Sequence, residues 1–122
     1  MKIIIDKIAD GPSHSVSKKD IETIIKHIPK EWLGIKNVFR LSNQEFINSK
    51  WDRPVICNGV TYVISSRNLD RDFIIKELLI EIALAPTKVM NSVNHHHINK
   101  NDRKKLEEFI QPFYDKITAE LK

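Results

Sequence analysis

The feature that most constrains the fold is a long apolar run, residues 70–85, with the sequence DRDFIIKELLIEIALA. Asp70 and Asp72 suit the positive end of a helix, and Pro86 is expected to stop that helix. Its large apolar side chains cannot share one stripe; they are Phe73, Ile74, Ile75, Leu78, Leu79, Ile80, Ile82 and Leu84. We therefore expect this helix to lie between a sheet on one side and another helix on the other.

Signals for two strands and a helix precede this run. Residues 2–8, KIIIDKI, are rich in β-branched side chains and lead to a Gly-Pro loop, which predicts a first strand. Ser17, followed three residues later by Asp20, forms a hydroxyl-plus-acid pair that satisfies free amides at a helix start, and Pro29 is expected to end the helix. Residues 35–42, IKNVFRLS, alternate with a period near two and predict a second strand.

An Asn-Gly pair between two β-forming runs, in PVICNGVTYVIS, is the clearest local signal. Asn58 and Gly59 readily take the two positive-φ positions of a type I′ turn, so we expect a hairpin here. Residues 101–122 carry apolar side chains every three or four positions, which predicts a terminal amphipathic helix. Together these elements predict one α+β domain over residues 1–122, with a mixed or antiparallel sheet of about four strands, including the Asn-Gly hairpin, packed with three helices.

Composition agrees with a single folded domain. The chain has 122 residues, of which 41% are hydrophobic and 30% charged, a balance that is typical of globular proteins and not of disordered tails. The one cysteine, Cys57, allows no intramolecular disulfide and no cysteine-based metal cluster, which fits a reducing compartment. Neither a signal-peptide pattern nor an apolar run of roughly eighteen residues is present, so we expect a cytoplasmic protein without a membrane partner.

Charge gives only a weak indication of a nucleic-acid partner. The formal net charge is +4, with 20 basic and 16 acidic residues mixed along the chain. The densest basic clusters are short, and each is followed by acids. One is Lys18 with Lys19, and the other is Arg103 with Lys104 and Lys105. If the chain binds nucleic acid, these five side chains are the candidates for contacts with phosphates.

Two glutamates and a histidine triplet supply side chains of the kind that bind metals. Glu77 and Glu81 stand one helical turn apart, and His95, His96 and His97 follow in a polar connection. Adjacent residues of an extended loop point to different sides, so surface histidines are one interpretation, and the glutamates are then the solvated edge of the helix. The alternative is that His95 or His97 joins Glu77 or Glu81 on a divalent ion such as zinc, as in a metal-dependent hydrolase.

The order of elements resembles that of the small zincin-like metallopeptidases of bacteria and their phages. The stretch GVTYVISSRNLDRDFIIKELLIEIAL is similar to their edge strand, a polar turn and the helix that carries His-Glu-x-x-His in active members. NDRKKLEEFIQPF resembles the following helix, and IETIIKHIPKEWLGIKNVFRLS resembles an earlier helix, a proline turn and a strand. The resemblance implies a zincin-like arrangement of the sheet and helices.

The ligand pattern of those enzymes is absent from this chain. In one alignment the motif reads Lys76-Glu77-Leu78-Leu79-Ile80, which keeps Glu77 as the catalytic base but has no imidazole at either ligand position. Shifted by one residue, Glu77 and Glu81 stand at the ligand positions and Leu78 replaces the base. We therefore expect a catalytically inactive zincin-like module that binds a protein partner, with a hydrolase or a nucleic-acid-associated protein as alternatives.

Overall fold

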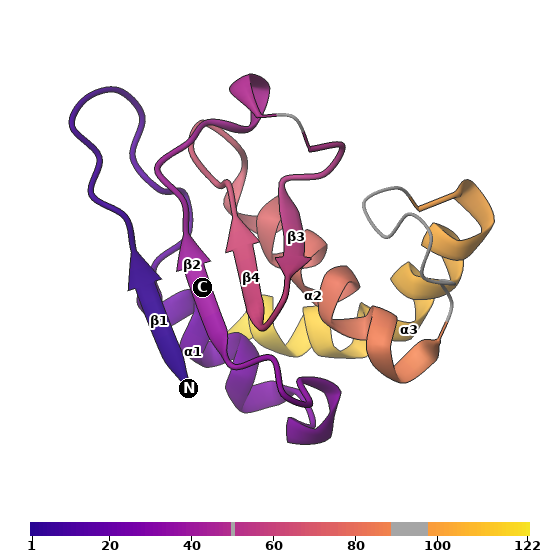
Figure 1. Cartoon of the computed structure of the whole chain (residues 1–122). Coiled ribbons are helices and arrows are strands. Elements are labelled where there is room, and N and C mark those ends of the chain that lie inside the picture. Colours follow the sequence, from indigo (N-terminus) through magenta and orange to yellow (C-terminus); the bar gives the residue numbers. More distant parts are fainter. Residues whose placement is uncertain (50, 89–97) are drawn as a thin grey trace.

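A four-stranded mixed sheet and three α-helices make up the computed structural model, which describes residues 1–49, 51–88 and 98–122 (Figure 1). This confirms the predicted α+β class. In chain order the elements are β1 (Lys2–Ile5), α1 (Lys18–His27), the 3-10 helix η1 (Lys30–Trp32), β2 (Val38–Leu41), the 3-10 helix η2 (Phe46–Asn48), β3 (Val55–Asn58), β4 (Thr61–Ile64), α2 (Arg71–Thr87) and α3 (Lys100–Glu120).

The strands lie in the order β1-β2-β4-β3, so β1 and β3 form the two edges of the sheet. β1 pairs with β2 and β2 with β4 in parallel, whereas β3 runs antiparallel to β4. Phe39 and Leu41 of β2 and Tyr62 and Ile64 of β4 are buried, because these alternate residues face the helices. Figure 1 shows the helices gathered on that one face of the sheet.

The turn between β3 and β4 differs in detail from a type I′ turn at Asn58-Gly59. Asn58 is still part of β3 and pairs with Thr61, so the turn itself consists of Gly59 and Val60. Gly59 has a φ of +64°, but Asn58 is not among the described residues with positive φ. A glycine at the first of two turn positions is the pattern of a type II′ turn, which also matches the twist of paired strands.

The helix starts predicted at Ser17 and Asp70 are confirmed by the structure, whereas the expected stop at Pro86 is wrong. The Ser17 hydroxyl accepts a hydrogen bond from the Asp20 amide at 3.2 Å, and the Asp20 carboxylate accepts one from the Ser17 amide at 2.8 Å. Asp70 caps α2 through the Phe73 amide. Pro86 lies within the last turn of α2, and the left-handed Lys88, with a φ of +52°, ends the helix.

α2 is the central helix of the core. Nine of its residues are buried, and the helix packs on β3 on one side and on α3 on the other, as its all-round apolar character predicts. α3 adds Leu106, Ile110 and Ile117 to the same core. None of the helices in the described ranges is long and apolar enough to cross a membrane.

Candidate functional site

The two glutamates of α2 are buried, so their interpretation as a solvated edge is wrong. Glu77 is 2% exposed and Glu81 is 3% exposed. Acidic side chains are rarely buried to this extent unless a charged partner accompanies them. Both partners here are arginines from other parts of the chain, Arg53 and Arg103, and we call these four residues the buried Arg–Glu network.

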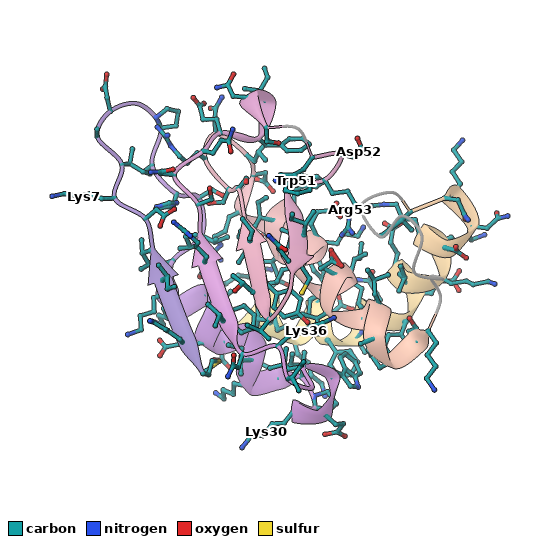
Figure 2. The ribbon with its side chains drawn as sticks, viewed as in Figure 1. Lys7, Lys30, Lys36, Trp51, Asp52 and Arg53 are labelled. Atoms are coloured by element: carbon teal, nitrogen blue, oxygen red, sulfur yellow. The ribbon has the colours of Figure 1, made fainter. Side chains whose placement is uncertain are left out.

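Arg53 lies two residues before β3 and is itself only 6% exposed. Its Nη1 lies 3.3 Å from Oε1 of Glu81, and its Nε lies 3.9 Å from Oε1 of Glu77. Nη2 also donates to the backbone carbonyl of Glu77 at 3.5 Å. Figure 2 shows Arg53 between the start of β3 and the two long helices. One guanidinium therefore bridges both carboxylates and joins the edge of the sheet to α2.

Arg103 approaches Glu77 from the first turn of α3. Its Nη2 lies 2.6 Å from Oε2 of Glu77, and its Nη1 donates to Oε1 at 3.3 Å, so the pair is bidentate. The hydrogen bond to Glu77 raises the pKa of Arg103, which keeps the guanidinium charged. Farther out, Lys76 Nζ lies 2.7 Å from Oε2 of Glu107.

Burial raises the pKa of Glu81 above its ordinary value. Arg53, Lys36 and a hydrogen bond from the Cys57 backbone lower this pKa, while the charge of Glu77 raises it. The net rise shows that desolvation outweighs the favourable neighbours. For Glu81, both the loss of water and the nearby charge of Glu77 therefore raise the pKa of the carboxyl group.

Three residues of the sheet side complete the surroundings of Glu81. Burial raises the pKa of both the Cys57 thiol and the Tyr62 phenol, so both stay neutral at physiological pH. The Tyr62 hydroxyl is buried and has no hydrogen-bond partner among the described atoms. Lys36 Nζ lies 5.9 Å from the centre of the Tyr62 ring, and Figure 2 shows this lysine near the hairpin end of β4. The neutral thiol and phenol are not activated as nucleophiles.

The structure brings together only some of the residues predicted for a site. Glu77, Glu81 and Arg103 meet in the network, whereas His95 and His97 lie outside the described residues. Within residues 1–49, 51–88 and 98–122, no three His, Cys, Asp or Glu side chains gather as a metal site would require. The guanidinium groups already neutralise these two carboxylates, so a cation would have to compete with Arg53 and Arg103 for them.

The basic residues predicted for nucleic acid do not form one stripe. Lys18 and Lys19 are exposed at the start of α1, and Lys104 and Lys105 are exposed in the first turns of α3. The end of α1 contacts the far end of α3 through the Lys26–Glu120 ion pair. Because a helix rises about 1.5 Å per residue, the start of α3 is roughly 25 Å away from that contact. Arg103 is directed at Glu77 instead of standing free for a phosphate.

Arg53, Lys36 and Tyr62 were missed by the sequence reasoning. Lys36 and Tyr62 lie in segments predicted as strands, but the alternation of a strand does not reveal which polar groups will meet a distant helix. Arg53 stands in an irregular segment, and its only local signal is the following Pro54, which marks the start of a strand. Comparisons of this chain with protein-family models, with curated proteins and with solved structures find no match.

Proposed function

We propose that this chain is a catalytically inactive module of zincin-like arrangement that binds a protein partner. The observation that carries the proposal is the buried Arg–Glu network on α2, the helix that resembles the active helix of the metallopeptidases. In such enzymes that position needs open ligands for zinc and a free base for its bound water. Here Glu77 and Glu81 form ion pairs with Arg103 and Arg53 instead of standing free for a metal or a water molecule.

Both alignments of the metallopeptidase motif support loss of activity. With Lys76 and Ile80 as ligands, one is an ammonium paired with Glu107 and the other is a fully buried hydrocarbon. With Glu77 and Glu81 as ligands, both carboxylates share one side of α2 but are paired with arginines, and the buried Leu78 takes the place of the base. Neither alignment supplies the ligands and the base together.

Exposed apolar side chains near the hairpin support the binding of a protein partner. Ile35 is 81% exposed and Val60 is 41% exposed. The amides of Asn37 and Val38 both donate to the Val60 carbonyl, at 3.1 and 3.2 Å, and so hold the two segments together. We call Ile35 and Val60 the hairpin-end surface. Apolar groups exposed on neighbouring segments are typical of protein interaction sites when they form one patch.

The partner can be tested by affinity capture from extracts of the native cells, followed by titration of the purified candidate. Ile35→Lys and Val60→Lys should each weaken binding at least tenfold, because a buried charge replaces an apolar contact. Ile47→Lys is the matched control, since Ile47 is 85% exposed and lies in η2, apart from this surface. A partner that binds all three variants equally would contradict this surface as the binding site.

Zinc-dependent melting tests the inactive centre. A metal ion that binds only the folded state must raise the melting temperature. Because Glu77 and Glu81 are paired with arginines, we expect zinc to cause no such rise through these two residues. Glu81→Gln serves as the control variant. A stabilisation by zinc that disappears in Glu81→Gln would support the metal-dependent hydrolase instead.

A further inference from the structure

The two edges of the sheet are covered very differently. At the β3 edge, α2 packs alongside and Glu81 accepts a hydrogen bond from the Cys57 backbone, while Pro54 at the start of this strand has no N–H. At the β1 edge, no described element pairs with the outer side of the strand. Figure 1 shows β1 as the outermost strand, and Figure 2 shows Lys7, just beyond it, pointing away from the molecule.

Hydrogen-bond direction shows which groups of β1 are unpaired. Lys2 N donates to Asn37 O and Asp6 N donates to Leu41 O, each at 2.9 Å, so the even-numbered residues of this strand face β2. Because the direction alternates along a strand, Ile3 and Ile5 direct their backbone N–H and C=O groups outward. Such a row of unpaired groups is a template for another strand.

Side chains at this edge are also unprotected. Ile5 is 50% exposed and Met1 is 67% exposed. Edge strands of natural proteins are usually blunted by a proline, a bulge or a charge. Lys2 begins β1 and Asp6 follows it, but the three residues between them, Ile3–Ile5, carry no proline and no charge. The outward backbone groups of this short apolar stretch are accessible to another strand, which can replace the water that they bind.

We propose that β1 is a self-association edge, at which a second copy of this chain pairs antiparallel with β1 across a two-fold axis through Ile4. Ile3 then faces Ile5 of the partner subunit, and the two residues exchange both of their outward hydrogen bonds. The symmetry-related pair does the same, which makes the contact isologous and closed. The two sheets become one continuous sheet, and the exposed Ile5 side chain packs against Ile3 of the partner subunit.

Opposite charges favour the register with Ile4 on the two-fold axis over registers that are shifted by one or two residues. With Ile4 on the axis, Lys2 stands directly opposite Asp6 of the partner subunit, and both lie on the face of the sheet away from the helices. Asp6 already accepts a hydrogen bond from Arg40 Nε at 3.1 Å on the β2 side, so the partner lysine approaches from the opposite side. A slip of one residue would send every side chain to the wrong face, and a slip of two would leave Lys2 opposite an isoleucine.

Sedimentation equilibrium of the full chain over roughly 10 µM to 1 mM tests the proposal. We expect a monomer–dimer equilibrium whose dissociation constant rises about tenfold in Lys2→Glu, because each Lys2–Asp6 attraction becomes a repulsion. Lys30→Glu makes the same change of net charge on the exposed η1 helix and should leave the dissociation constant unchanged. A chain that stays monomeric at about 1 mM, or a dimer that Lys2→Glu leaves intact, overturns the proposal.

Disulfide trapping provides an independent test of the register. Ile4 and Ile4 of the partner subunit form a non-hydrogen-bonded pair, whose Cα atoms are about 4.5 Å apart and therefore within disulfide range. In a Cys57→Ser background, Ile4→Cys should oxidise to a covalent dimer at least tenfold faster than Ile35→Cys. Equal rates would overturn the two-fold axis at Ile4, and faster trapping of Ile35→Cys would place self-association at the hairpin-end surface instead. Circular dichroism verifies that each variant is folded.

Discussion

Removal of Arg53 is the perturbation that best examines the buried network. Arg53→Ala leaves Glu81, which is 3% exposed, without its guanidinium, while Glu77 keeps Arg103. Removing one partner of a buried ion pair costs about 3–5 kcal/mol, since the remaining charge stays desolvated. With a urea m-value of about 1.5 kcal/mol/M, the midpoint of unfolding should fall by roughly 2–3 M. The loss should shrink as pH falls, because burial raises the pKa of Glu81 and its unpaired carboxylate can then take up a proton.

Urea unfolding followed by tryptophan fluorescence measures this loss, since Trp32 and Trp51 are both native reporters. Arg40→Ala is the matched control. Arg40 is 50% exposed and pairs with Asp6 at the surface, so its removal should cost less than about 1 kcal/mol. Arg53→Lys keeps the charge but loses the bridging geometry, and it gives an intermediate value if Arg53→Ala is too unstable to measure. A cost below about 1 kcal/mol for Arg53→Ala would refute the reasoning.

Three further predictions concern the ionisation of Glu81, the cap of α1 and the aromatic contacts of Trp32. Burial raises the pKa of Glu81, so the contribution of this residue favours folding at low pH and is lost as pH rises through that pKa. The free energy of unfolding of Glu81→Gln should therefore increase relative to that of wild type between pH 4 and 8 in a series of urea melts. A difference that stays constant over this pH range would contradict the prediction. Ser17→Ala removes the cap of α1 and should cost about 1 kcal/mol in the same assay, whereas Ser17→Asp should cost little. Trp32 packs at 5.1 Å from Phe109 and 4.7 Å from Phe113, so Trp32→Ala should cost about 2 kcal/mol and Trp32→Phe clearly less; equal costs would exclude the aromatic contact as the cause.

Features that depend on neighbours in sequence were predictable. The caps at Ser17 and Asp70 and the all-round burial of α2 follow from residues within one or two helical turns. The position of the tight turn was misjudged by one residue, because Asn58-Gly59 can be either the two turn residues or the last strand residue and the first turn residue. Pairing of the hairpin strands themselves is local.

The candidate site could be predicted only in part, because its charge balance is not local. Glu77 lies 24 residues from Arg53 and 26 residues from Arg103, and the three come together only when β3, α2 and α3 pack. From the sequence alone, two acids one turn apart on an apolar helix suggest either a solvated edge or a metal site. The two arginines replace the solvated-edge interpretation with a buried ion-pair network, whereas a metal site that includes His95 or His97 stays a prediction, since these histidines lie outside the described residues.

We propose that α2 of this chain carries no peptidase centre. Turnover of a mixed fluorogenic peptide library, with zinc supplied, tests it most directly. We predict that wild type, Glu77→Gln and the exposed control Glu22→Gln show the same background rate, because the Glu77 carboxylate is held by Arg103 and is 2% exposed. Zinc-dependent turnover that is lost in Glu77→Gln and kept in Glu22→Gln, with both variants folded, would contradict the claim.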